Sequence, residues 1–145
     1  MKKTHVVISD VFASNRLIIF SIGVIYFVFG VLKFFPNFSP AEDIAKKTID
    51  VLIHNSVHSD ISYLVLAMWE TLIGLFFILN YKQRIVTISA IIHLSLTFSV
   101  FFIFPELSFN KSTFSFTLLG QYVVKNIVIL SVLINLLRNS TASNH

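Results

Sequence analysis

The sequence contains no cysteine, and charged residues make up only 12% of its 145 positions. Without cysteine the chain can form neither disulfides nor thiolate metal sites, and covalent thiol chemistry is excluded. Soluble domains carry about 25% charged residues, so this composition argues against a soluble domain. Internal repeats, low-complexity tracts and Gly/Ser linkers are also missing from the sequence. We therefore expect a single domain over residues 1–145.

Hydrophobic residues make up 55% of the chain, and its mean hydropathy is +0.81. Four segments are long and apolar enough to cross a bilayer: residues 17–35, 61–81, 85–104 and about 117–137. Each has about 19–21 residues, which at roughly 1.5 Å per residue span the hydrocarbon layer of about 30 Å. A soluble bundle with buried helices would need more strongly amphipathic segments. The sequence therefore predicts an all-α fold, a four-helix transmembrane bundle in a lipid bilayer.

The net charge of +4 is a topology signal, because no segment resembles a basic helix that reads nucleic acid, and we expect no nucleic-acid partner. Cations beside the predicted spans are more frequent on one side of the membrane than on the other. They are Lys2, Lys3, Arg16, Lys82, Arg84 and Arg138 on one side, and Lys46, Lys47 and Lys111 on the other. The positive-inside rule then places both termini and the 82–84 turn in the cytoplasm.

A helix start signal lies between the first and second predicted spans. Ser39 stands at the N-cap position, Pro40 at the first helical position, and Glu42 three residues after Ser39, as in a capping box. The apolar residues that follow fall near one face, and the charged residues fall largely elsewhere. This pattern predicts a short outer helix that lies at the membrane interface.

Ionisable residues lie inside the predicted spans, where they are costly. A lysine near the centre of a transmembrane helix costs roughly 2.5–3.5 kcal/mol, whereas each Leu, Ile, Val or Phe returns about 0.3–0.6 kcal/mol. Counted inward from the outer ends, Lys33, Lys125, Glu70 and His93 all lie in the outer half of the membrane or near its midplane. We therefore expect one buried polar cluster that is contributed by all four helices and opens toward the outer side.

Helical spacing adds polar neighbours to this cluster and predicts how its charges pair. Thr97 shares a helix face with His93, and Gln121 shares one with Lys125, beside Asn126. The cost of desolvation favours an ion pair between Glu70 and Lys125. Such a pair can be structural or part of a functional pocket, and both interpretations stay open. The candidate ligand-binding residues are Lys33, Glu70, His93, Thr97, Gln121, Lys125 and Asn126.

Some members of this cluster have simpler interpretations. Lys33 lies so near the membrane boundary that its ammonium group can snorkel to water. His93 can be a hydrogen-bonded core residue, and no second intramembrane histidine exists to complete a bis-histidine site. We therefore expect neither haem nor a metal ion. Ala67 and Gly74 share a face with Glu70, and such small residues permit a close approach of helices.

Four short motifs carry a family resemblance. "FGVLKFFP" closes the first predicted span, "WETLIGL" lies in the second, "HLSLTFSVFFIFPE" ends the third, and "TLLGQYVVKN" opens the fourth. In this order and at these depths they resemble the DoxX-like family of small bacterial membrane proteins, including its branch related to reactive-chlorine-resistance inner-membrane proteins. The resemblance covers about residues 16–137. It implies a four-helix bundle in the bacterial cytoplasmic (inner) membrane, and redox roles, since some relatives are subunits of a thiosulfate:quinone oxidoreductase or associate with redox-defence enzymes.

Two hypotheses of function follow from the residues and the resemblance. In the first, the chain is a membrane subunit whose outward-opening pocket holds a quinone head group or a similar small molecule in a redox or oxidative-stress complex. It lacks a soluble catalytic domain, so we expect a non-autonomous oxidoreductase subunit rather than an independent enzyme. In the second, the chain is a non-catalytic partner or assembly factor whose buried polar network is structural. The sequence leaves a homo-oligomer open.

Overall fold

The computed structural model of this chain describes residues 2–39, 42–53, 58–110 and 115–142, and for residues 2–15 and 139–142 it describes the backbone alone. The predicted first helical residue Pro40 and the outer cation Lys111 lie outside the described residues, as do the side chains of Lys2 and Lys3.

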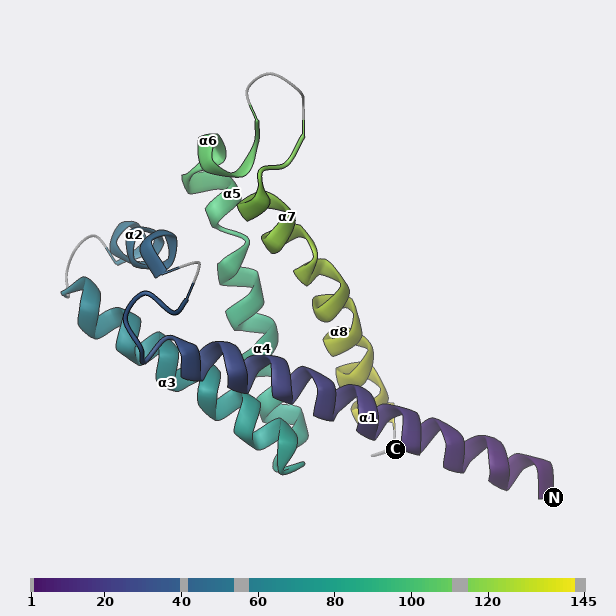
Figure 1. Cartoon of the computed structure of the whole chain (residues 1–145). Helices are drawn as coiled ribbons and strands as arrows, with labels where there is room; N and C mark the ends of the chain where they lie inside the picture. Colours follow the sequence, from purple (N-terminus) through teal and green to yellow (C-terminus); the bar gives the residue numbers. More distant parts are fainter. Residues whose placement is uncertain (1, 40–41, 54–57, 111–114, 143–145) are drawn as a thin grey trace.

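Regular structure in the described part of the chain is helical, which confirms the all-α prediction. The helices are α1 (Lys2–Leu32), α2 (Glu42–Leu52), α3 (Ser59–Ile78), α4 (Gln83–Thr97), α5 (Val100–Ile103), α6 (Pro105–Ser108), α7 (Leu118–Val124) and α8 (Asn126–Ala142). Phe109 and Phe116 form an isolated antiparallel bridge between α6 and α7. The order of the elements along the chain can be followed in Figure 1.

Three helical stretches among the described residues are long and apolar enough to cross a membrane: Ser59–Ile78, Gln83–Ile103 and Leu118–Arg138. They match the second, third and fourth predicted spans. The first predicted span lies on α1, of which the apolar part Arg16–Leu32 is shorter. This helix ends at Leu32, before the predicted boundary at residue 35, because Pro36 disfavours the helical conformation at the residue that precedes it.

Two of these stretches are interrupted, although the sequence predicted them as continuous helices. The stretch Gln83–Ile103 is interrupted at Phe98 and Ser99, between α4 and α5. The stretch Leu118–Arg138 is interrupted at Lys125, between α7 and α8. There the Val128 N–H donates to the Lys125 carbonyl, three residues earlier, at 3.1 Å. Neither proline nor glycine lies at either interruption, so the sequence gives no signal for these local changes in the hydrogen-bond ladder.

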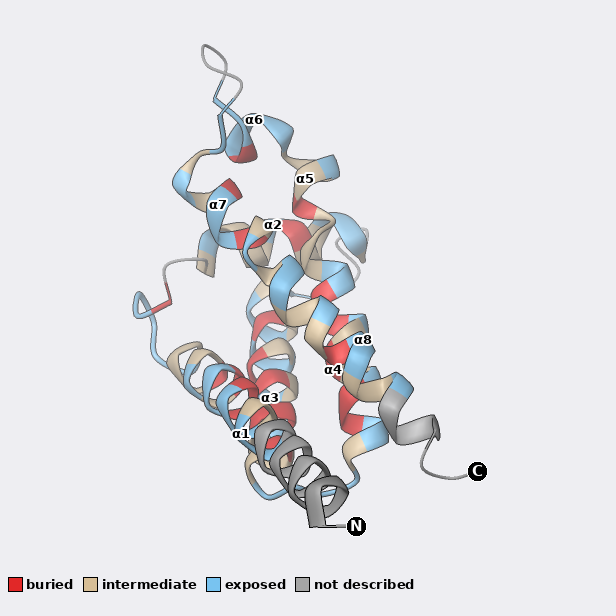
Figure 2. Ribbon diagram, turned by 90° about the vertical axis from the view of Figure 1, so that its right-hand side faces the viewer, coloured by how far each residue is buried: buried red, intermediate tan, exposed pale blue. Residues whose placement is uncertain are grey.

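The helices pack side by side in an order that leaves one side of α1 open. α1 packs along α3, α3 packs on α4, and α4 packs on α8. The contact between α1 and α3 is very close: a Cβ atom added to Gly74 would lie 2.3 Å from the Phe27 backbone nitrogen. This confirms the predicted role of Gly74 in helix approach. Figure 2 shows buried residues concentrated where α3 and α4 face the interior.

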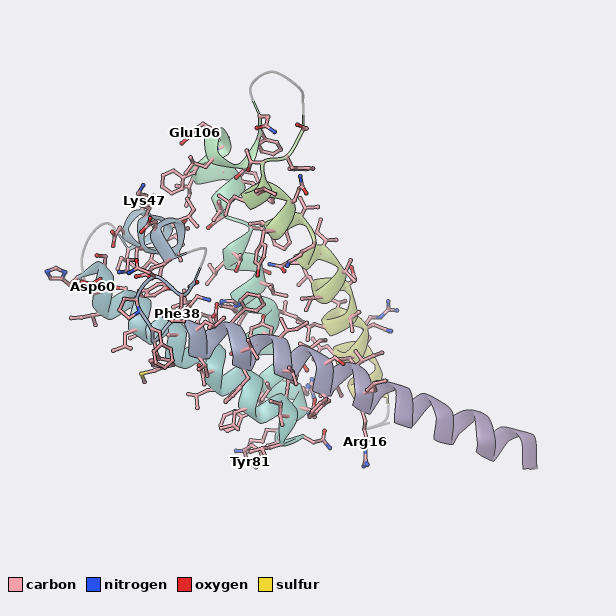
Figure 3. All side chains as sticks on the ribbon, viewed as in Figure 1. Arg16, Phe38, Lys47, Asp60, Tyr81 and Glu106 are labelled. Carbon is pink, nitrogen blue, oxygen red and sulfur yellow. The ribbon has the colours of Figure 1, made fainter. Side chains whose placement is uncertain are left out.

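The two ends of the molecule carry different elements. Figure 3 places Phe38, Lys47, Asp60 and Glu106 toward the end formed by α2 and α6, and Arg16 and Tyr81 at the opposite end. The start of α1 and the end of α8 lie toward the Arg16 end in Figure 1. The start of α1, the end of α8 and Tyr81, just before α4, therefore lie at one end of the molecule.

α2 is held by ion pairs, and its start differs from the predicted capping box. The Glu42 carboxylate accepts a hydrogen bond from the Asn37 N–H at 2.9 Å, instead of from the Ser39 N–H. Lys46 Nζ lies 2.8 Å from Asp60 Oδ1 on α3 and 3.1 Å from Glu42 Oε1. The Asn37 N–H and then Lys46 lower the pKa of Glu42, and the bonds to Asp60 and Glu42 raise the pKa of Lys46.

Candidate functional site

The buried carboxylate of Glu70, on α3, is the centre of the polar cluster. Its Oε2 atom accepts a charged hydrogen bond from the Lys33 ammonium, just after α1. Its Oε1 atom lies 2.9 Å from Nε2 of His93, on α4. The side chains of Glu70 and Lys33 are only 8% and 9% exposed. One carboxylate thus joins three helical segments, and each of its oxygens has a partner.

The predicted Glu70–Lys125 ion pair is not formed between these two described residues, and Lys33 takes the place of Lys125. The physical reason is the order in which the helices pack. α3 lies against α1 and α4, whereas α8 lies against α4, so Glu70 faces the end of α1 rather than the fourth predicted span. The alternative that Lys33 snorkels to the boundary is also wrong, because its side chain turns inward and is buried.

His93 continues the hydrogen-bonded network on the other side of its ring. Its Nδ1 atom lies 3.3 Å from the hydroxyl of Tyr26, which in turn donates to the Ala90 carbonyl at 3.1 Å. The Trp69 ring meets the His93 ring edge-on at 5.4 Å between centroids, and its Nε1–H donates to Ser89 at 2.8 Å. His93 is therefore a hydrogen-bonded core residue with both ring nitrogens engaged.

Lys125 is placed differently from Lys33. Its ammonium nitrogen lies 3.5 Å from the centroid of the Tyr122 ring, a cation–π contact. The Tyr122 ring also meets the Phe29 ring of α1 edge-on, at 5.9 Å between centroids. Among the described residues, no carboxylate lies within ion-pair distance of Lys125. Lys125 is also exposed, whereas Lys33 is not.

A cavity of about 530 Å³ lies between α1, α4 and the α7–α8 stretch, and brings these groups together. Its polar lining consists of Tyr26, Glu70, His93, Thr97, Tyr122, Lys125 and Asn126. The remaining wall is mostly apolar and includes Ile44 and Ala45 of α2, which cover one end. Exposed Ile25 of α1 and exposed Val128 of α8 both line the cavity, so it opens between these two helices.

The predicted site residues divide into three groups. Glu70, His93, Thr97, Lys125 and Asn126 line the cavity. Lys33 reaches it only through its bond to Glu70. Gln121 does not line it, and its side-chain amide donates to the Phe116 carbonyl at 3.3 Å.

The sequence prediction missed three aromatic residues that complete the site. Tyr26, on the first predicted span, is hydrogen-bonded to His93. Tyr122 precedes Lys125 by three residues, a spacing that places both on one helix face. Trp69 directly precedes Glu70 and lies against His93. The available signal was an aromatic residue close in the sequence to Glu70 and to Lys125.

Comparison of the chain with protein-family models, with curated proteins and with solved structures finds no match.

Proposed function

We propose that this chain is a multi-pass protein of the bacterial cytoplasmic membrane, with four spans, one DoxX-like domain and both termini in the cytoplasm. Three stretches of membrane length and the apolar Arg16–Leu32 segment of α1 support the four spans. The cationic Arg16 and Tyr81–Lys82 end would face the cytoplasm. α2 would then lie at the outer interface, with its ion pairs to Asp60 in the wetter region.

The cavity is proposed to hold the head group of a quinone or a similar small molecule with an apolar tail. The observation that supports this is the combination of a 530 Å³ cavity, apolar walls and a few polar groups that converge at one place. Binding pockets for small molecules have typical volumes of about 300–1,000 Å³ and this same mixture of linings. An opening between two apolar helices would admit a ligand dissolved in the bilayer.

The free donors of the cavity define how a head group would be held. Glu70 and His93 already bond each other and their neighbours, so they supply the electrostatic background. The Lys125 ammonium and the Asn126 amide have no hydrogen-bond partner among the described residues. They would donate to the carbonyl oxygens of a quinone, while Thr97, which donates to the His93 carbonyl, retains lone pairs that can accept.

The chain would act as a non-autonomous subunit of a redox or oxidative-stress complex rather than as an independent enzyme. The resemblance of its motifs to the DoxX-like family supports this part of the proposal. No step of electron transfer is assigned to its own residues. A protein partner would supply the redox chemistry.

The test uses Trp69, the only tryptophan of the chain, as a reporter beside His93. Titration of purified protein with decylubiquinone should quench Trp69 fluorescence saturably at one equivalent. Asn126→Leu should weaken this binding, whereas Asn135→Leu, on the same helix but exposed and outside the cavity, should leave it unchanged. Quenching that never saturates, or that is equal in both variants, would remove the quinone site.

A second function is favoured by one observation, the complete pairing of Glu70 within the chain. Because Lys33 and His93 satisfy both carboxylate oxygens, the buried network needs no ligand, and holding the helices together is a sufficient role for it. The chain would then be a non-catalytic membrane partner or assembly factor. In that case Glu70→Gln lowers stability without altering a redox phenotype, and a pull-down in mild detergent recovers a reproducible companion protein.

A further inference from the structure

The cavity contains one cation whose charge is not balanced by the protein. Lys33 neutralises Glu70, and His93 is a donor to the same carboxylate. Glu70 is the only carboxylate among the described residues that line the cavity. Lys125 lines the cavity as well, with an aromatic ring as its only close partner there. The walls of the cavity therefore carry a net positive charge.

The depth of Lys125 makes this charge costly without a ligand. Lys125 follows Thr117, the N-cap of α7, by eight residues, which places it about 12 Å along the helical stretch at 1.5 Å per residue. A lysine at such a depth requires an anion, water or a polar cavity, and intramembrane lysines of this kind are characteristic of binding sites. The cation–π contact with the Tyr122 ring replaces only part of the lost hydration of the ammonium group. Such a contact is weaker than a charge-assisted hydrogen bond to an anion.

The shape of the cavity indicates what the compensating anion is attached to. Phe29, Leu119 and Ile129 provide apolar wall, and the cavity opens between Ile25 and Val128, which are both exposed in membrane-facing helices. A soluble inorganic anion would leave these apolar surfaces uncovered. An anion with an apolar chain would cover them and would reach the site from the bilayer.

We propose that the cavity binds a single-chain amphiphile with an anionic head group, a carboxylate or a phosphate. The Lys125 ammonium binds the head group, and the neighbouring Asn126 amide donates a second hydrogen bond. The apolar chain lies along the walls formed by α1 and α7–α8. This inference rests on the proposed function, a site for a small molecule with a polar head group and an apolar tail, and it assigns that head group a negative charge.

The experiment compares brominated ligands, which quench tryptophan at short range, by the fluorescence of Trp69 in the full-length protein at pH 8, because Trp69 packs against the cavity-lining His93. The probes are dibromostearic acid, dibromostearyl alcohol with the same chain, and decylubiquinone; oleoyl lysophosphatidic acid is added as a competitor. The acid should bind about tenfold or more tightly than the alcohol, as one charge-assisted hydrogen bond predicts. Lys125→Gln should abolish this preference, and Lys125→Arg should retain most of it.

The matched control is Lys82→Gln, because Lys82 also contacts a tyrosine ring, Tyr81, at 5.4 Å but does not line the cavity. This variant should retain the preference. Equal binding of acid and alcohol to the wild-type protein would overturn the anionic ligand while leaving a quinone site intact. Failure of every probe, including the quinone, would overturn the proposed function itself. Displacement of the acid by the lysophospholipid at lower concentration would identify phosphate as the preferred head group.

Discussion

The two sides of α1 differ in how closely they approach the rest of the molecule. Toward α3, the helix backbones are so near that Gly74 leaves no room for a Cβ atom, and the buried Lys33–Glu70 pair closes the end of the contact. Toward α7 and α8, the same helix faces a cavity of about 530 Å³ and touches Tyr122 through Phe29. The difference shows a division between a packed structural side and an open side available to a ligand.

The largest expected effect is on the packed side, from replacing Glu70 with glutamine. The change leaves the Lys33 ammonium buried without its counter-charge, and breaking one partner of a buried pair typically costs about 3–5 kcal/mol. The free energy of unfolding in mixed micelles should fall by that amount. Glu106→Gln, at an exposed position of α6, is the control and should have almost no effect. A loss below about 1 kcal/mol for the Glu70 variant would show that the pair does not hold α1 to α3.

The next largest effect is expected from Gly74→Val, which forces α1 and α3 apart. The new side chain would meet the backbone of Phe27, which cannot move aside as a flexible side chain can. Overpacking of this kind costs about 1–3 kcal/mol, and occasionally more. Thermal unfolding in detergent measures the loss. Leu72→Val, on the exposed face of the same helix, should change the midpoint little, and equal losses for both would contradict the close packing.

A smaller effect on stability is expected on the open side, from Lys125→Met. The variant loses a cation–π contact of about 0.5–2 kcal/mol, and it also removes the cost of placing an ammonium group in the membrane. The net change in unfolding free energy should stay within about 1 kcal/mol of zero. Destabilisation as large as that of the Glu70 variant would mean that both sides of α1 are structural.

The smallest effect concerns α2, which covers one end of the cavity. The pKa of Glu42 is lowered in the folded protein by the Asn37 N–H and Lys46, so its contribution to stability is present above the ordinary value of about 4.3. This contribution is lost as the pH falls through the folded pKa. Hydrogen exchange of α2 amides should show reduced protection under these acidic conditions in the wild-type protein. Glu42→Gln should remove the pH dependence, and an unchanged dependence would exclude Glu42 as its source.

Much of the architecture could be predicted from the sequence, because length and apolar composition determine where helices form. Depth counting also brought Lys33, Glu70, His93 and Lys125 to one level of the molecule. It could not choose between the two lysines, since depth along a helix says nothing about which helices are neighbours. That choice depends on the close packing of α1 on α3, which Gly74 permits.

The interruption at Lys125 was not predictable for a different reason. Val123 and Val124 precede it and Asn126 and Ile127 follow it, and neither proline nor glycine lies within three residues to mark the change of hydrogen bonding. Tyr122 was overlooked because an aromatic residue in a transmembrane stretch is usually a lipid contact. Its position three residues before Lys125 gave the relevant signal.

The most direct test of the division between the two sides is a pair of double-mutant cycles with methionine substitutions, read as free energies of unfolding in the same micelles. One cycle couples Glu70 with Lys33, and the other couples Glu70 with Lys125. The account predicts a coupling of about 1–3 kcal/mol for the first pair and a value within about 0.5 kcal/mol of zero for the second. A strong coupling between Glu70 and Lys125, with none to Lys33, would contradict it.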